Sequence, residues 1–284
     1  MDSWPKISLV VPNYNGGATL GATLRSLVEQ DYPALEILVA DGGSTDDSVA
    51  VIQEYARHLT WWVSAKDRGQ SHAINKGFAR ATGEVVNWLC SDDVLEPGAL
   101  RIVGRHFAED ADLDVLVGAG RLRYAGSDWQ RVKTPHQDML RLMPCLNPID
   151  QPSCFFRRRT LDRPQPVRED LHFCMDLELW CHFQSCGRKF QCIPEVLASL
   201  IHSDANKTTV GGPKIIREWK RVYREYCPER ISLVFWQSLL RHPLAKLRRR
   251  FPGGRVERGA AAVDMFLQRA LGKFYGFDRV HALD

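Results

Sequence analysis

Acidic residues stand after apolar runs at two places in the first hundred residues of this chain. Asp92 and Asp93 follow Ser91 directly after one such run, and Asp41 follows another, before two glycines. Two adjacent carboxylates repel each other, and a divalent cation held by oxygen ligands relieves that repulsion. A carboxylate at a strand end can also accept hydrogen bonds from a base or a ribose. These residue types allow a cation-assisted nucleotide site, although each motif by itself is also compatible with a solvated turn.

The elements that must position these side chains alternate along the first 120 residues. Short apolar runs predict strands, and apolar residues at helical spacing predict helices between them. The predicted strands are residues 7–11, 36–40, 61–63, 84–89 and 114–118, and the predicted helices are residues 19–30, 46–57, 71–81 and 97–108. Helical crossovers favour a mainly parallel sheet flanked by helices, an α/β fold, in which ligands bind beyond the carboxyl ends of the strands. The acidic residues fall at those ends.

Prolines interrupt the pattern between residues 121 and 168, and regular structure resumes after them. A helix is predicted over 176–186, strands over 189–193 and 196–201, and helices over 213–226 and near 230–241 and 260–275. We therefore expect one sheet domain over 1–212, whose pattern changes near residue 120. A C-terminal helical appendage (213–284) would follow.

Charge divides along the same boundary. The net charge of +4 combines a net of −5 over residues 1–212 with a segment, 213–258, that carries 13 basic and 4 acidic residues. Aromatic residues interleave with the basic ones, which favours an amphipathic helical region that binds an anionic membrane surface. Packing on the domain or a homodimer contact explains the pattern equally well, and nucleic acid fits poorly beside a nucleotide site.

Composition and missing motifs exclude several classes. The apolar share of 44% and the charged share of 25% are average for a globular chain. No signal peptide and no apolar run of about 18 residues are found, so we expect a cytoplasmic protein with reduced cysteines. There is no glycine-rich dinucleotide motif, no phosphate-binding loop motif and no hydrolase elbow, so those enzyme classes lose their main support.

Several short motifs occur in order along the chain. They are VVPNYN at 10–15, DGGSTD at 41–46, DRGQ at 67–70, AINKG at 73–77, ATGE at 81–84, SDD at 91–93, DLELW at 176–180 and IPEVL at 193–197. Together they resemble the inverting glycosyltransferases of family 2, which have the GT-A fold, over about residues 6–207. Each motif is weak alone, but their joint order and spacing are highly specific.

The resemblance implies that 1–212 is a catalytic domain with a nucleotide-sugar-binding half (1–120) and an acceptor half (121–212). It also implies a donor site for a nucleoside-diphosphate sugar. In it, the nucleobase pocket is lined by the backbone of Pro12 and by Tyr14, and Asp41 binds the base or ribose. The other donor contacts would come from Asp67 and Arg68 near the base or diphosphate, from Asp92 on the ribose or sugar, and from Gln70 and Asn75. Asn75 could equally cap or pack.

The resemblance also implies catalytic and metal-binding roles. Asp93 would bind Mn²⁺ or Mg²⁺, and His202 could complete that site. Asp176 would be the general base that takes the proton of the acceptor hydroxyl, although Met175 stands where the family motif has glutamate. Gln151, Glu178 and Trp180 fall on the stretches expected at the acceptor side, although Glu178 should point away from Asp176 on a helix.

The function implied is a metal-dependent inverting glycosyltransferase that acts in cell-surface polysaccharide or glycolipid synthesis. It would move a sugar from a UDP-, GDP- or dTDP-linked donor to a glycan or lipid-linked acceptor. Two alternatives stay open: a nucleotidyltransferase of similar fold, and a catalytically silent module that binds nucleotide sugars. The enzyme would work in the cytoplasm, with peripheral association at the cytoplasmic face of the membrane as an extension of that expectation.

Overall fold

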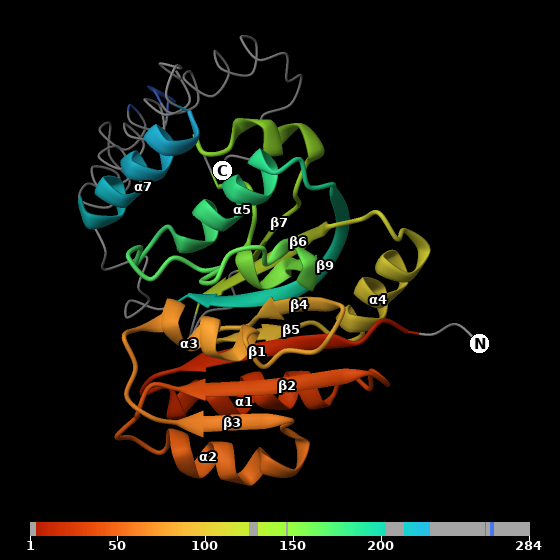
Figure 1. Cartoon of the computed structure of the whole chain (residues 1–284), viewed down its shortest axis with the longest axis vertical. Helices are drawn as coiled ribbons and strands as arrows, with labels where there is room; N and C mark the ends of the chain where they lie inside the picture. The colour runs from red at the N-terminus through yellow and green to blue at the C-terminus, as the bar shows by residue number, and fades with distance from the viewer. Residues whose placement is uncertain are drawn as a thin grey trace.

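A computed structural model describes residues 4–124, 130–145, 147–202 and 213–227, together with residues 259, 262 and 263. Within them, helices cover both faces of one curved sheet (Figure 1). The predicted helix near 230–241 lies outside the described residues, as does the one near 260–275 except for residues 262 and 263, which are helical.

The bounds of the elements are as follows. The strands are β1 (Ile7–Asn13), β2 (Leu35–Asp41), β3 (Trp61–Ser64), β4 (Val85–Trp88), β5 (Asp93–Leu95), β6 (Val115–Tyr124), β7 (Gln130–Lys133), β8 (Cys154–Arg157) and β9 (Phe190–His202). The α-helices are α1 (Gly17–Val28), α2 (Ser48–Tyr55), α3 (Gln70–Phe78), α4 (Ala99–Glu109), α5 (Met175–Ser185) and α7 (Pro213–Tyr226). Short 3₁₀ helices occupy 56–58, 137–142, 151–153 and 158–160.

The sheet has two differently built halves. Its order is β3-β2-β1-β4-β8-β6-β9-β5, with β7 paired to β6. The pairs among β3, β2, β1 and β4 are parallel, as the helical crossovers predicted. Beyond β4 the sheet is mixed, because β8 runs antiparallel to both β4 and β6, and β5 runs antiparallel to β9. The α/β class is confirmed, and the expectation of a mainly parallel sheet holds for the first half.

Alternation along β1 shows why the sheet needs helices on both sides. Ile7, Leu9 and Val11 point into one apolar core with α1, α2 and α4, whereas Val10 points into the other with α3, α5 and α7. All seven residues of β1 are buried. A strand that is buried on both faces is central in a covered sheet, and the mostly apolar sequence of β1 is typical of such a strand.

Three strands of the second half, β5, β7 and β8, were not predicted. β5 has three residues and β8 lies among prolines, so neither presents a periodic pattern of useful length. The two strands predicted over 189–201 are one strand, β9, which passes through Pro194. Its pairing with β6 shifts register between Cys192 and Val196, and such an irregularity accommodates a residue with no amide hydrogen to donate.

The helix predicted over 213–226 is present with those bounds as α7, and it packs against the sheet domain. Val222 is fully buried in the core shared with α3 and α5, and Ile215 and Trp219 pack against that core. The apolar face of α7 is thus covered by the domain itself. Among the described residues, no helix has the length and apolar character needed to cross a membrane.

Candidate active site

Three polar side chains meet where the first parallel strands end. The register pairs Asn13 of β1 with Asp41 of β2, and Asp41 with Ser64 of β3. The Asp41 carboxylate accepts hydrogen bonds from the side chains of Asn13 (2.7 Å) and Ser64 (2.6 Å). The carboxyl edge predicted from the sequence is therefore a real cluster of interacting groups.

The loop after β2 closes over the same carboxylate. Asp41 is fully buried and also accepts hydrogen bonds from the hydroxyl of Ser44 (2.5 Å) and from the amides of Gly43 and Ser44 (3.1 and 3.0 Å). Burial by itself disfavours the ionised form, but these hydrogen bonds outweigh it, and the pKa of Asp41 lies below its ordinary value. Asp41 is a fixed anion that shapes the loop, with its oxygens already occupied by the protein.

The loop after β1 presents an aromatic ring beside this cluster. The Tyr14 side chain is 67% exposed, whereas Pro12, two residues earlier, is buried in β1. The loop is tied down because Asn15 exchanges hydrogen bonds with Ser44 and Thr45 of the next loop. An exposed aromatic ring on a fixed loop is a suitable stacking surface for a nucleobase.

Asp67 lies directly against the backbone of the loop after β2. A methyl group added at Gly42 would come within 3.0 Å of a carboxylate oxygen of Asp67, so glycine leaves the space that this carboxylate fills. Asp67 also accepts a hydrogen bond from the Gly69 amide (2.8 Å). Its neighbour Arg68 is mostly exposed and forms an ion pair with Glu169 (2.7 Å). Of the two, Asp67 lies beside the nucleotide edge.

The structure assigns other partners to the two amide side chains predicted for the donor site. Asn75 donates to the carbonyl of Val167 (2.7 Å) and accepts from the Val167 amide (3.0 Å), so it holds the loop before α5. These hydrogen bonds correspond to the alternative in which Asn75 packs within the fold. Gln70 donates to Cys90 Sγ (3.1 Å), which brings the start of α3 to the end of β4.

The acidic pair after β4 is strongly desolvated. Asp93 is only 8% exposed, and burial together with the neighbouring Asp92 charge raises its pKa well above the ordinary value. Burial raises the pKa of Asp92 as well. Ligand atoms of Cys90, Asp92 and Asp93 all lie within 4.8 Å of one another. A divalent cation fits this donor set, because it would neutralise two carboxylates that burial and repulsion otherwise disfavour.

His202 lies on the strand that supports this pair. Asp93 begins β5 and is paired with Leu200 of β9, and His202 ends β9 two residues further on. The placement is compatible with the predicted role of His202, which stays a prediction.

The predicted base Asp176 occupies the first turn of α5. Its carboxylate accepts a hydrogen bond from Asn147 (3.0 Å). Backbone hydrogen bonds at Leu177 and Asp176 and the charge of Lys133 also favour its ionised form. Burial outweighs these effects and raises the pKa of Asp176. A carboxylate with a raised pKa is a stronger base than an exposed one, as a general base requires.

A charge pair connects the base to the acidic pair. Lys133 donates to Asp150 (2.9 Å) and to the carbonyl of Asn147 (3.3 Å), so it lies next to the residue that holds Asp176. The Asp150 charge is in turn close enough to Asp93 to raise the pKa of that carboxyl further. The Lys133–Asp150 pair therefore interacts electrostatically with both Asp176 and Asp93.

Two of the three residues expected on the acceptor side are interior residues, which corrects that expectation. Glu178 and Trp180 are both 0% exposed. Trp180 stacks on Trp88 with ring centroids 5.8 Å apart, and Glu178 forms an ion pair with Arg163 (2.8 Å). These two side chains of α5 therefore pack the helix against Trp88 of β4 and Arg163. Gln151 donates to the Trp88 carbonyl (2.8 Å) at the end of β4, and its acceptor role stays a prediction.

Four residues of the site went unrecognised in the sequence: Cys90, Lys133, Asn147 and Asp150. Cys90 had a signal, because it immediately precedes the SDD motif at the end of a predicted strand. The other three lie in the proline-rich stretch, where no periodicity places them. Only the pairing of β7 with β6 and the loop that follows bring them to the site.

Solved structures share this architecture. TarS from S. aureus in complex with UDP-GlcNAc aligns with a TM-score of 0.58 and 18% identity, over 97% of this chain and 74% of that one. A mannosyltransferase from Pyrobaculum calidifontis in complex with GDP-Man and Mn²⁺ aligns with a TM-score of 0.57 and 20% identity, over 97% and 73%. These likenesses show the fold, which is the GT-A fold of glycosyltransferases.

Sequence comparison then gives the family. Residues 8–164 match the family described as glycosyl transferase family 2, and the chain belongs to it. An uncharacterized protein of Mycobacterium tuberculosis is 30% identical over 225 residues, 72% of this chain and 70% of that protein. A GalNAc(5)-diNAcBac-PP-undecaprenol beta-1,3-glucosyltransferase of Campylobacter jejuni is 34% identical over 100 residues, 34% of this chain and 32% of that protein. The protein is a glycosyltransferase, and it spans about a third of the length of this second relative.

Proposed function

We propose that this glycosyltransferase uses a nucleoside-diphosphate sugar and a divalent cation, and that it inverts the anomeric carbon. The observation that carries the proposal is the joining of two desolvated acidic centres in one site by the Lys133–Asp150 pair. One centre, Asp92 with Asp93, suits a cation. The other, Asp176, suits a base.

The donor would lie along the carboxyl edge of the parallel strands. Tyr14 would stack on the base, and Asp67 would accept a hydrogen bond from it or approach the diphosphate. Asp92 would contact the ribose or sugar, and Asp93 with Asp92 would hold Mn²⁺ or Mg²⁺. When bound, that cation supplies positive charge for the developing diphosphate anion.

The acceptor hydroxyl would lie against Asp176. Its carboxylate would take the hydroxyl proton as the oxygen attacks the anomeric carbon from the face opposite the departing diphosphate. A single in-line displacement inverts that carbon. Asn147 would hold the carboxylate in place during the transfer.

The solved structures and the relatives indicate which classes of donor and acceptor to test first. UDP-GlcNAc and GDP-Man occupy the two solved structures, so UDP- and GDP-sugars are the first donors to test, with dTDP-sugars next. The Campylobacter relative is named for an undecaprenol-linked substrate, which supports a glycan or lipid-linked acceptor in cell-surface polysaccharide or glycolipid synthesis.

The test is a thermal-shift panel followed by a turnover assay. UDP-, GDP- and dTDP-sugars are added with Mn²⁺, with Mg²⁺ or with EDTA, and nucleoside diphosphate release is then measured for the sugars that stabilise the protein. Cation-dependent stabilisation with release of nucleoside diphosphate supports the proposal. Pyrophosphate release would indicate a nucleotidyltransferase, and binding without turnover a silent module.

The basic segment, residues 213–258, would determine whether the enzyme works at a membrane surface. Since α7 buries its apolar face against the domain, the proposed contact with an anionic membrane falls to residues 228–258, where the tight basic cluster of Lys246 and Arg248–Arg250 lies. Flotation with anionic vesicles at low salt tests this peripheral, cytoplasmic-face association. Failure to float would remove the membrane proposal and favour packing or a homodimer contact.

A further inference from the structure

One side chain of α7 caps the start of α5. The Glu218 carboxylate accepts hydrogen bonds from three successive backbone amides, those of His172 (3.0 Å to each oxygen), Phe173 (2.6 Å) and Cys174 (3.1 Å). Cys174 is the N-cap residue of α5, and its own side chain makes no capping hydrogen bond. The Cys174 amide is one of the first four of the helix, which have no partner within it, and the other two amides belong to the loop that enters α5. The Glu218 carboxylate therefore holds this loop at the helix start, where negative charge matches the positive end of the helix dipole.

The next residue of α7 holds the other half of the base site. Trp219 Nε1 donates to the carbonyl of Pro144 (2.6 Å), three residues before Asn147. Asn147 in turn donates to the Asp176 carboxylate (3.0 Å). Two adjacent side chains of α7 therefore hold both segments that meet at Asp176, the one that carries the carboxylate and the one that carries its hydrogen-bond donor.

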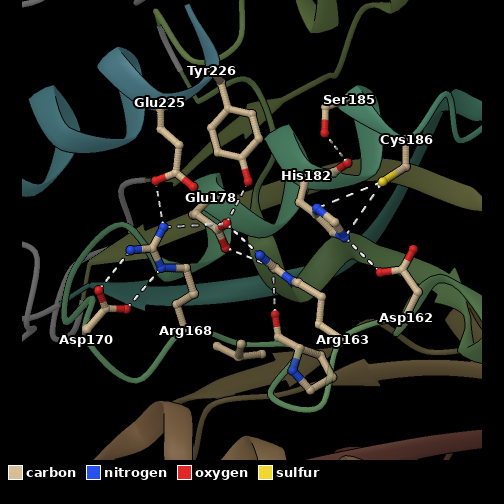
Figure 2. A network of polar contacts seen from close by, with 12 residues as sticks. Asp162, Arg163, Arg168, Asp170, Glu178, His182, Ser185, Cys186, Glu225 and Tyr226 are labelled. Carbon is tan, nitrogen blue, oxygen red and sulfur yellow. Dashed lines mark hydrogen bonds and ion pairs between the residues drawn. The ribbon is translucent and has the colours of Figure 1, made fainter.

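The helix that carries these side chains is itself fixed. Val222 is fully buried, and Tyr226 donates from its hydroxyl to Glu178 of α5 (2.7 Å), which Arg163 also pairs (Figure 2). Near the end of α7, Glu225 forms a half-exposed ion pair with Arg168 (2.7 Å), and such a surface pair contributes little to the position of the helix. Glu218 thus has a rigid base from which to hold the amides.

We propose that Glu218 is a positioning residue that sets the place of Asp176. The inference rests on the proposed role of Asp176 as the general base. Asp176 is two residues beyond the last amide that Glu218 holds, so a shift of this helix start moves the reacting carboxylate with it. A displacement of about 1 Å at a reacting group can cost about 100-fold in rate. Glu218 acts through backbone amides, and its role is to position the base.

The experiment compares Glu218→Ala with Glu225→Ala, a matched variant that removes a carboxylate from the same helix without touching the start of α5. UDP-GlcNAc and GDP-mannose with Mn²⁺ are the probes, and release of UDP or GDP gives kcat. We expect Glu218→Ala to lower kcat by about 10- to 100-fold, with the affinity for UDP or GDP within about twofold of wild type. We expect Glu225→Ala to leave both within about twofold. Normal kcat in Glu218→Ala would overturn the proposal.

A double variant separates positioning from general support of the fold. If Glu218 acts through Asp176, then Glu218→Ala should cause no further loss in an Asp176→Asn background. An equal loss in both backgrounds would overturn the proposal. Full activity of Asp176→Asn by itself would show that the proposed function has failed, whereas an inactive Asp176→Asn beside a normal Glu218→Ala would show that only the positioning inference has failed.

Hydrogen exchange gives a readout that needs no substrate. The amides of residues 172–177 should exchange faster in Glu218→Ala than in Glu225→Ala, and unchanged exchange would contradict the capping role. If Glu218→Ala does not fold, Glu218→Gln replaces it. Glutamine can keep one oxygen toward the three amides but loses the charge, so we expect a smaller drop in kcat, about 3- to 10-fold, again absent in the Asp176→Asn background. Wild-type kcat in Glu218→Gln would then overturn the proposal.

Discussion

Asp41 in the first half of the sheet is fully buried, Asp176 in the second half is partly buried, and their pKa values move in opposite directions. Asp41 accepts five hydrogen bonds from β1, β3 and the loop after β2, and its pKa is lowered. Asp176 accepts fewer, from the Asn147 side chain and from the backbone at Leu177 and Asp176, and its pKa is raised despite the favourable charge of Lys133. The number of donors that face a buried carboxylate decides whether burial prevails.

This difference separates two uses of the same residue type. A carboxylate saturated with donors is a permanent anion that fixes the loops at the carboxyl edge of the parallel strands. A carboxylate with few donors is poised to take a proton. The donors of Asp41 come from strand ends that the parallel pairing aligns, whereas Asp176 depends on segments brought from far along the chain. The second arrangement should therefore be the more sensitive to single substitutions.

The sharpest test of the contrast is Asp176→Asn. An amide cannot accept the acceptor proton, so we expect kcat to fall by about 100- to 10,000-fold, the usual contribution of a general base. Nucleoside diphosphate release gives the rate, and calorimetry with the donor should show unchanged affinity. Near-normal turnover would remove Asp176 from the base role and leave the second half without a proton acceptor.

Asp93→Asn tests the acidic pair, Asp92 and Asp93, as the proposed cation site. Since even an outer partner of a metal site contributes about 10- to 100-fold in metal affinity, loss of a proposed ligand should weaken cation-dependent donor binding at least as much. Donor affinity is measured with Mn²⁺ and with EDTA. Asp112→Asn, an exposed carboxylate, is the matched control. The same cation dependence in Asp93→Asn and wild type would count against the site.

Asn147→Ala should shift the pH dependence of turnover. The base works only when ionised, so the rate falls as pH drops through the pKa of Asp176. Asn147 favours the ionised form, and its removal raises that pKa. A hydrogen bond to a charged group contributes about 1.5 kcal/mol or more, so the acid limb of kcat should move up by about one pH unit. An unmoved acid limb would show that Asn147 does not tune the base.

Gly42→Ala tests the first half of the sheet, where more hydrogen bonds hold the loops, and should have the smallest effect. The added methyl group would meet Asp67 at 3.0 Å and displace its carboxylate by a few tenths of an ångström. If Asp67 contacts the donor, affinity should fall by about 3- to 10-fold, in line with a strained side chain costing about 0.5–1.5 kcal/mol. Gly21→Ala on α1 is the control, because its methyl group would meet only Val51, at 3.8 Å. Equal donor affinity in both variants would remove Asp67 from the donor site.

The residue pattern predicts the elements of the first half of the molecule. Strand–helix alternation predicts parallel pairing through crossovers, and strand ends carry their polar residues to one edge whatever the details of packing. The residue pattern alone therefore places Asp41, Asp92 and Asp93 together at that edge. The motif order also led to the family and to Asp176, since the spacing of short motifs survives where overall similarity is weak.

The surroundings of Asp176 follow from tertiary packing and could not be predicted from the sequence. The mixed pairing of β6, β7, β8 and β9 joins segments with no common periodicity, so Lys133, Asn147 and Asp150 gave no sign of their role. Burial likewise moved Glu178 and Trp180 from the expected acceptor side to the interior. The hydrogen bonds that Glu218 accepts from the amides of Phe173 and Cys174 span more than forty residues of sequence. Such contacts depend on how helices pack in three dimensions, which local residue patterns do not encode.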